Sequence, residues 1–341
     1  MTNQTRDLKL NYRFQQYTLL ISIGLMIFKF LAWFFTSSNA ILTDAAESIV
    51  NVIAAGLGTY ALYLSSLPRD RNHPYGHGKV EFLSAGVEGT MILLASITMI
   101  SKAVYDLFMP HEIQRVHDGI IIVAIAGLVN YIWGFYIQKR GEKVRSIALE
   151  ASGKHLKSDA YSTIGLVLGL GILYFFPLGW IDNVLAVLFG TIIFISGYGI
   201  LRKSVAGIMD EADSELINSL VKNLDENRHS EWIDIHNFRV VKYGSQLHID
   251  AHLTVPWYYQ VSEMHEEVDA LNDQVNTICG SEVEMFVHVD PCNEDSCAIC
   301  TLSNCKERKQ KFSRIIEWNL SNITKNQKHQ LKQVTHEKID P

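Results

Sequence analysis

Six long apolar segments in the first 205 residues limit the fold of this chain more than any other feature. They lie near residues 17–36, 40–64, 83–108, 118–138, 158–177 and 181–201. Each approaches the roughly 20 apolar residues that a helix needs to cross the hydrocarbon core of a bilayer. Core helices of a soluble protein can also be apolar, but six such segments joined by short connections favour a membrane domain.

Basic residues near these segments predict how the segments cross the membrane. They lie mainly before the first segment and after the second, fourth and sixth: Arg6, Lys9, Arg13, Arg69, Arg71, Lys79, Lys139, Arg140, Lys143, Arg145, Arg202 and Lys203. The loops on the opposite side hold one clear basic residue, Arg115. Because cytoplasmic loops are enriched in Lys and Arg, we expect a multi-pass protein with both termini in the cytoplasm. Residues 1–16 do not resemble a signal peptide, and a bacterial inner membrane is the expected location.

The second part of the chain is more polar and contains alternating helical and β-rich patterns. A helical stretch near 211–226 precedes two β-rich stretches, "WIDIHNFRVVKYG" and "SQLHIDAHLTV". A second helix near 261–278 and the strand "SEVEMFVHVDP" follow. This αββαβ order suits a small α+β domain of the ferredoxin-like type. The formal net charge of −6 does not indicate nucleic-acid binding.

The sequence therefore divides into five parts: a cytoplasmic N-terminal segment (1–16), a six-helix transmembrane domain (17–208), a cytosolic αββαβ domain (209–291), a Cys-rich segment (292–305) and a polar tail (306–341). In the tail, apolar residues recur at roughly helical spacing, at Phe312, Ile315, Ile316, Trp318 and Leu320. This spacing predicts either an amphipathic helix against the membrane or the domain, or a solvated extension.

Polar side chains interrupt the second and fifth apolar segments. Glu47 and Asn51 are four residues apart, and so are His155 and Asp159, so each pair lies on one face of its helix. Ionisable groups within a membrane are costly unless they are partnered. Two helices that each present such a pair can surround one divalent cation, because imidazole and carboxylate bind first-row metals. Polar contact between helices is the alternative, above all for Asn51.

Two further acids lie within the predicted membrane segments. Asp44 is one turn before Glu47, where it either assists charge neutralisation or proton transfer, or faces water at the membrane interface. Glu88 lies in the third segment, and the sequence assigns it no specific role.

Two groups of His and Asp outside the membrane segments also offer metal ligands. The loop "RDRNHPYGHGK" carries Asp70, His73 and His77 within eight residues. In the predicted soluble domain, "HIDAH" and "HVD" place such residues on single strand faces, and neighbouring elements add more. The candidates there are His236, His248, Asp250, His252, His265, His288 and Asp290. Solvated surface histidines are the alternative explanation for both groups.

Four of the five cysteines form a compact group, Cys292, Cys297, Cys300 and Cys305. Disulfides are rare in the cytosol, so this spacing favours a metal site, with structural zinc as the first interpretation. An iron–sulfur centre or redox-sensitive thiols are alternatives. Cys279 is expected to be a small buried apolar residue at a helix end.

These patterns together resemble the cation diffusion facilitator family of proton-coupled divalent-metal efflux transporters. The resemblance rests on "LTDAAESIVNVIAAG", "HPYGHGKVE" and "HLKSDAYSTIG", and continues in "HNFRVVKYGSQLHIDAHLTV" and "FVHVDP". The motifs occur in order and cover about residues 12–291.

The resemblance implies a homodimer of six-helix units that binds divalent metal ions and protons, and it assigns roles to specific residues. Its transport site falls on Glu47, Asn51, His155 and Asp159, and its loop site on Asp70, His73 and His77. A binuclear site between paired soluble domains falls on His236, His252, His265, His288 and Asp290. A charge interlock that holds the dimer together falls on Lys79 and Asp210.

One departure from the family pattern bears on the metal. Zinc-type members usually carry His or Asp and then Asp at the positions that Glu47 and Asn51 occupy. The neutral Asn51 removes a charge, which leaves zinc, manganese, ferrous iron and cobalt open as substrates. The working hypothesis is a proton-coupled exporter of divalent metal cations. The alternative is a membrane-anchored metal sensor that does not transport.

Overall fold

The computed structural model describes residues 3–36, 39–108, 120–175, 180–279 and 283–331. The chain divides into two compact units, one of long helices and one that contains a small sheet. The helical unit comprises Met1–Asp210 together with Tyr243–Ser245, and the second unit comprises Glu211–Lys242 and Gln246–Pro341. The second unit is called the sheet domain below.

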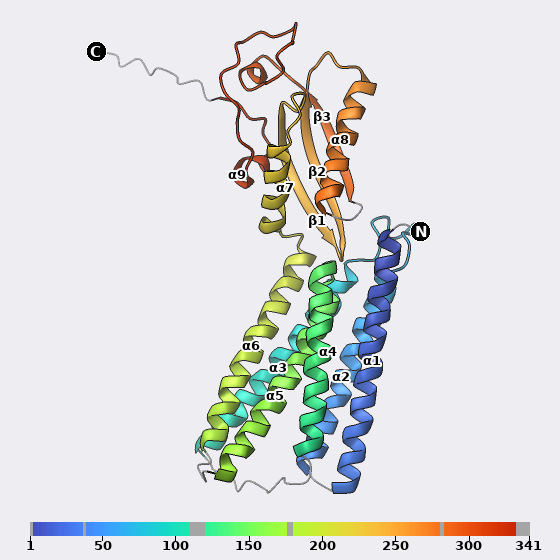
Figure 1. Ribbon diagram of the computed structural model, residues 1–341, viewed down its shortest axis with the longest axis vertical. Coiled ribbons are helices and arrows are strands. Elements are labelled where there is room, and N and C mark those ends of the chain that lie inside the picture. Colours follow the sequence, from blue (N-terminus) through green and yellow to red (C-terminus); the bar gives the residue numbers. More distant parts are fainter. Residues whose placement is uncertain (1–2, 37–38, 109–119, 176–179, 280–282, 332–341) are drawn as a thin grey trace, which may run out of the picture. The chain divides into compact units, whose positions relative to one another are not determined.

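The helical unit contains six helices of 25 to 34 residues: α1 (Asn3–Thr36), α2 (Asn39–Ser65), α3 (Val80–Phe108), α4 (Ile120–Val144), α5 (Ile147–Phe175) and α6 (Trp180–Ile208) (Figure 1). At 1.5 Å per residue, even the shortest exceeds the roughly 30 Å of a bilayer core. Within the described residues, four helices contain stretches apolar enough to cross a membrane, at Leu8–Phe35, Ser48–Ser65, Val80–Phe108 and Asn183–Ile208. The helical unit is therefore of the membrane type.

Two helices begin well before the apolar segments that the sequence analysis marked. Helix α1 begins at Asn3, whereas the apolar segment begins near residue 17, and α5 begins at Ile147, whereas its apolar segment begins near residue 158. Charged residues lower the hydropathy of these first turns without interrupting the helix. Hydropathy thus located the helices but placed the start of α5 about three turns too late.

The helices pack in pairs, most extensively α3 with α6, α4 with α5 and α1 with α2. Small residues allow this close packing. At the α4–α5 contact, a Cβ atom on Gly153 would lie 2.4 Å from the backbone nitrogen of Gln138. The two backbones therefore approach each other at a distance that only glycine permits.

The sheet domain contains α7 (Ser214–Glu226), β1 (Asp234–Tyr243), β2 (Gln246–Val255), α8 (Val261–Cys279) and β3 (Glu284–Pro291). These elements follow the predicted helix–strand–strand–helix–strand order. The strand order is β1-β2-β3, and β2 and β3 are parallel, with His252 opposite His288. Buried side chains from both helices, β1 and β2 form one hydrophobic core, against which β3 packs with partly buried side chains, and this packing fixes the faces of β2 and β3 that carry His and Asp.

The polar tail differs from both sequence-based expectations. Residues 301–319 form turns and coil rather than an amphipathic helix, and the short α9 (Leu320–Ile323) follows them. Up to residue 331, where the described part of the tail ends, it is not a solvated extension either, because Trp318 is only 3% exposed and Ile323 is fully buried in the core of the sheet domain. The Arg228 guanidinium lies 3.9 Å from the Trp318 ring centroid. The recurring apolar residues of the tail therefore do not form one helical face. Instead, individual side chains such as Trp318 pack into the core of the sheet domain along a non-helical segment.

We expect Trp318→Ala to lower the free energy of unfolding of the sheet domain by about 3–5 kcal/mol, because it empties a core position and removes the cation–π contact with Arg228. Thermal unfolding of the full chain in detergent measures the loss. Phe312→Ala is the matched control, since Phe312 belongs to the same tail but is 47% exposed and should change stability by less than about 0.5 kcal/mol. Equal effects of the two variants would contradict the anchoring role of Trp318.

Candidate metal-binding sites

Polar residues of α2 and α5 meet inside the helical unit. The Asn51 side chain is buried, and its Nδ2 donates to Asp159 Oδ2 at 2.6 Å. His155 Nε2 lies 3.0 Å from Asn51 Oδ1, and His155 is buried as well. The structure therefore brings together three of the four predicted ligands from the two predicted helices. We call Asn51, His155 and Asp159 the membrane-helix cluster.

Two predicted side chains of this region lie outside the part of the chain that the structure describes. They are Asp44 and Glu47, whose backbone belongs to α2. Because Glu47 precedes Asn51 by four residues in that helix, its Cα lies one turn away on the same face. Its role as a ligand and the role of Asp44 as a helper stay predictions.

Glu88 of α3, to which the sequence assigned no role, is 1% exposed and contacts α5. Its Oε1 accepts a hydrogen bond from Ser152 Oγ at 2.9 Å, and Gln15 Nε2 donates to the same hydroxyl at 2.8 Å. Glu88, Ser152, Asn51 and His155 line one small cavity of about 10 Å³. A buried carboxyl group therefore borders the membrane-helix cluster from a third helix.

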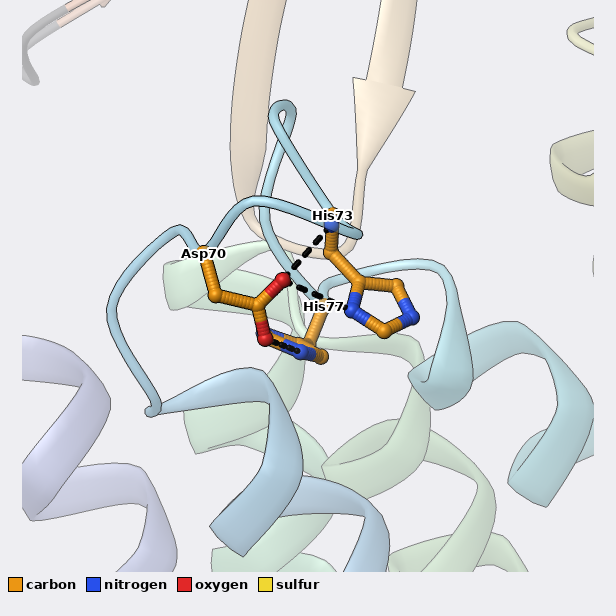
Figure 2. A group of neighbouring side chains, drawn as sticks. All are labelled: Asp70, His73 and His77. Atoms are coloured by element: carbon orange, nitrogen blue, oxygen red, sulfur yellow. Dashed lines mark hydrogen bonds and ion pairs between the residues drawn. The ribbon is translucent and has the colours of Figure 1, made fainter.

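The loop between α2 and α3 gathers Asp70, His73 and His77, which we call the loop cluster (Figure 2). Asp70 Oδ1 lies 3.1 Å from His73 Nδ1, and Asp70 Oδ2 lies 3.4 Å from His77 Nε2. Ligands about 2.0–2.1 Å from a tetrahedral ion are about 3.3 Å apart, so these distances fit one metal ion. The predicted grouping of the three side chains is confirmed, while ion binding stays a prediction.

Local backbone geometry holds the loop cluster in this arrangement. Asp70 Oδ1 accepts hydrogen bonds from the backbone N–H groups of His73, at 2.7 Å, and Asn72, at 2.8 Å. The His73 N–H, more than any other contact, lowers the pKa of the Asp70 carboxyl from its ordinary value. Gly76 has φ +86°, which returns the chain so that His77 faces Asp70. The carboxyl group is therefore ionised at neutral pH and preoriented for a cation.

Lys79 and Asp210, the predicted interlock, form an ion pair within the helical unit. Their side chains approach to 2.9 Å and remain partly exposed. The pair joins the start of α3 to the end of α6. Its role in holding two copies together stays a prediction.

In the sheet domain, Asp290 lies at the centre of the predicted His-rich group. Its carboxylate is 3.2 Å from His252 Nδ1, 3.5 Å from His236 Nε2 and 3.8 Å from His288 Nε2. The parallel register places His252 beside His288, and Asp290 two residues farther along the same strand. We call His236, His252, His288 and Asp290 the sheet cluster, and within it His236, His252 and Asp290 again have the spacing of metal ligands.

His265, the fifth residue of this predicted group, lies elsewhere. It is on α8, its side chain is 73% exposed, and its Nε2 lies 3.7 Å from Asp269. Among the described residues, the groups with metal-like spacing do not include it. Within one chain, α8 turns the His265 side chain to the surface, and its place in a site between paired domains stays a prediction.

Two residues that sequence analysis missed support the sheet cluster from behind. Asp234 Oδ2 lies 3.2 Å from His236 Nδ1, and His329 of the tail contacts the other oxygen of Asp234. Burial alone would raise the pKa of Asp234, but contacts with the His236 and His329 rings hold that pKa below its usual range. An ionised Asp234 beside Nδ1 favours the ring orientation in which Nε2 faces Asp290 and is presented to a metal. The pattern "DIH" was the available signal for Asp234, whereas nothing in the sequence indicated His329.

A third group with metal-like spacing, His229, Glu231 and Glu267, was also missed. Glu267 Oε2 accepts a hydrogen bond from Trp232 Nε1 at 2.8 Å and lies 3.2 Å from His229 Nδ1. The His229 ring stacks on the Trp232 ring at 4.2 Å. These contacts already give the group a structural role at the start of β1.

The four predicted thiols line one cavity at the end of β3. Cys300 is buried, and Cys292, Cys297 and Cys305 are partly buried. Burial raises the pKa of the Cys292 and Cys300 thiols. We call these four residues the thiol cluster. Cys279 packs at the edge of the main core, at the end of α8, as expected.

Comparisons with known proteins cover both units of the chain. The family model for the cation efflux transmembrane domain matches residues 16–209, and that for the cation efflux protein cytoplasmic domain matches residues 212–292. An uncharacterized transporter of Synechocystis sp. is 28% identical over 271 residues, which are 79% of this chain and 87% of that protein.

Two relatives have names that state a substrate. The zinc transporter ZitB of Yersinia pestis is 29% identical over 233 residues, which are 67% of this chain and 73% of that protein. The cadmium, cobalt and zinc/H(+)-K(+) antiporter of Bacillus subtilis is 22% identical over 288 residues, which are 84% of this chain and 91% of that protein.

We expect Asp234→Asn to weaken metal binding at the sheet cluster about 10- to 100-fold, because the neutral amide no longer fixes the orientation and protonation of His236. Isothermal titration of zinc into the full chain in detergent measures the change. Asp250→Asn is the matched control, since Asp250 is an exposed carboxyl on β2 outside the cluster. Thermal unfolding without metal separates lost affinity from lost folding. Unchanged affinity in a folded Asp234→Asn variant would contradict the positioning role.

Proposed function

The chain belongs to the cation efflux family, whose members are transporters and not enzymes, and we propose that it exports divalent metal cations from the cytoplasm in exchange for protons. One observation carries this proposal: Asn51 of α2 contacts both His155 and Asp159 of α5 inside the membrane-type unit. A protein that only anchored a sensor to the membrane would not need these buried polar groups, which are costly there.

The transported ion is bound by Glu47, Asn51, His155 and Asp159 while the site is open to the cytoplasm. In the present geometry Asn51 bridges the other two described residues, with its amide nitrogen on Asp159 and its oxygen on His155. A cation that enters takes over the carboxylate of Asp159 and the imidazole of His155, so both lose their contact with Asn51. Asn51 is thus the partner that satisfies these ligands when no ion is bound.

Proton exchange follows from the chemistry of the same ligands. An imidazole ordinarily titrates at about pH 6.5 and binds metal only in its neutral form. Metal entry therefore displaces the imidazole proton, and metal release allows the imidazole to bind a proton again. The B. subtilis relative is named as an antiporter that uses H⁺, which supports the same coupling here. Glu88 borders the cluster and offers a further carboxyl group for the proton.

The architecture proposed with this function has six spans formed by α1–α6. Both chain termini lie in the cytoplasm, and the location is a bacterial inner membrane. The sheet domain has a ferredoxin-like fold and pairs with that of a second copy, which brings His265 of one copy to the sheet cluster of the other. Surface exposure of His265 supports this role, because a ligand supplied across an interface must be exposed in the single chain. The Lys79–Asp210 pair stabilises the dimer near the membrane surface.

For the metal, we propose first-row divalent cations, with zinc, manganese, ferrous iron and cobalt as candidates. Zinc appears in the names of the Y. pestis and B. subtilis relatives, and cobalt in that of the B. subtilis relative. The proposed ligand set contains three oxygen donors and one imidazole, so it is more oxygen-rich than a site with several histidines. Oxygen ligands suit manganese, whereas imidazole suits zinc and iron. Residue 51 then becomes a determinant of selectivity.

We expect Asp159→Ala to reduce zinc-dependent flux to the background of empty liposomes, because it removes one charged ligand from the membrane-helix cluster. The measurement uses the purified chain in liposomes with an imposed pH gradient and a fluorescent metal indicator inside. Glu142→Gln, which changes an exposed acid of α4, should retain the parent rate. Transport by Asp159→Ala at the parent rate would show that the site is assigned wrongly. Absence of flux in the parent, with metal binding intact, would favour a membrane-anchored sensor.

We expect Asn51→Asp to change the ratio of zinc to manganese flux by roughly tenfold, which corresponds to about 1.4 kcal/mol of differential stabilisation. A third negative charge in the site strengthens binding of all divalent ions but not equally, since their preferred geometries differ. Flux measured across a panel of divalent ions gives the ratio, and Glu47→Asp tests side-chain reach without altering charge. A ratio that stays the same in both variants would rule out these residues as selectivity determinants.

A further inference from the structure

The thiol cluster lies almost wholly outside the residues that match the family models. The second match ends at residue 292, so only Cys292 falls within it, and Cys297, Cys300 and Cys305 lie beyond it. All four side chains nevertheless line one cavity of about 290 Å³, together with Trp257, Tyr258 and Arg308. Since roughly 10–15 Å³ is enough to hold one water molecule, this space is far larger than a single ion requires.

The spacing of the sulfur atoms is also too wide for a single ion. Four thiolates about 2.3 Å from a tetrahedral zinc ion lie about 3.8 Å from one another. Among the described residues, no three of these thiols have sulfur atoms that all lie within 4.8 Å of one another. The loop cluster meets that spacing, and so do His236, His252 and Asp290 of the sheet cluster. The sulfur atoms are therefore spaced more widely than one tetrahedral zinc ion requires.

Hydrogen-bond donors face each of the four sulfur atoms. The Lys309 backbone N–H donates to Cys297 Sγ at 3.4 Å. The backbone N–H groups of Trp257 and Leu302 face Cys292 and Cys300, and the Tyr258 hydroxyl faces Cys305. Donors directed at sulfur stabilise thiolates, and such contacts tune the reduction potential of iron–sulfur clusters.

The surroundings combine a fixed cation with apolar walls. The Arg308 guanidinium donates to the carbonyl oxygens of Cys297, at 2.9 Å, Cys300, at 3.1 Å, and Leu302, at 2.7 Å. It thus holds the loop around the cavity and places positive charge beside the thiols. Cys300 packs against Ile233 and Ile299, which exclude water from one side. A metal centre ligated by several thiolates is negatively charged, so this setting suits it.

We propose that Cys292, Cys297, Cys300 and Cys305 bind an iron–sulfur cluster. The first three cysteines have the C-x₄-C-x₂-C spacing found in plant-type ferredoxins, and Cys305 completes the four ligands that such a cluster needs. A cluster of several iron and sulfide ions holds its thiolate ligands farther apart than one zinc ion does. This difference explains both the sulfur spacing and the size of the cavity. The inference is independent of the proposed transport function, because it concerns a different part of the chain.

The test is metal and sulfide analysis of the full chain, purified in detergent without oxygen. We expect equimolar iron and acid-labile sulfide, a broad visible absorption that bleaches with dithionite, and an electron paramagnetic resonance signal in the oxidised or the reduced state. Zinc without sulfide, or neither metal nor sulfide after incubation with ferrous iron and sulfide, would overturn the proposal.

Variants of single cysteines locate the cluster. Cys300→Ser should lose the iron, the sulfide and the visible absorption. Cys305→Ser, at a partly exposed position, repeats the test with less effect on packing. Cys279→Ser is the matched control, since Cys279 lies at the end of α8, outside the cavity, and the variant should keep the parent content. Thermal unfolding shows whether each variant folds. Loss of iron and sulfide in Cys279→Ser alone, or their retention in both other variants, would contradict the assignment.

Discussion

A polar group enclosed by apolar helices must find a partner within the protein, and this constraint determines how the helical unit is assembled. Asn51 satisfies it by contacting Asp159 and His155 across α2 and α5. Fully buried Glu81 of α3 accepts a hydrogen bond from Ser65 of α2 at 2.7 Å and a second one from Ser146, next to α5. Glu88 reaches α5 through Ser152. Together these contacts tie α2, α3 and α5 to one another, and the contacts of Asn51 place the candidate ligands.

The sheet domain uses the same principle with ionised groups. Asp290 faces three imidazole rings, and Lys328 lies 3.5 Å from its other side. Asp234 balances His236 and His329 behind them. Each buried carboxylate in this row thus has polar partners on more than one side, which limits the cost of burying it. A cation bound at the cluster therefore enters a network that is already oriented, rather than one that must form around it.

Sequence patterns predicted the elements and ligand pairs that depend on local spacing. The i, i+4 pairs of α2 and α5, the turn that gathers Asp70, His73 and His77, and the strand faces of the sheet cluster all follow from helix, turn and strand geometry. The predicted helix–strand–strand–helix–strand order is likewise confirmed. His265 could not be placed in the same way, because its distance from the other histidines depends on which face α8 buries. Asp234 and His329 are 95 residues apart, so no local pattern joins them.

Because the tail packs into the core of the sheet domain, that domain as a folding unit extends beyond the residues that match the family model. The match to the second family model ends at residue 292. In the structure, however, Trp318 and Ile323 belong to the same core as α7 and the strands, and the backbone N–H of Asn237 in β1 donates to the Lys325 carbonyl oxygen at 2.8 Å. A chain cut at the family boundary would expose that core and leave Asp234 without His329. Chimeras that exchange this domain with a relative should therefore join the two sequences beyond residue 329, so that the tail and the sheet it packs against come from the same protein.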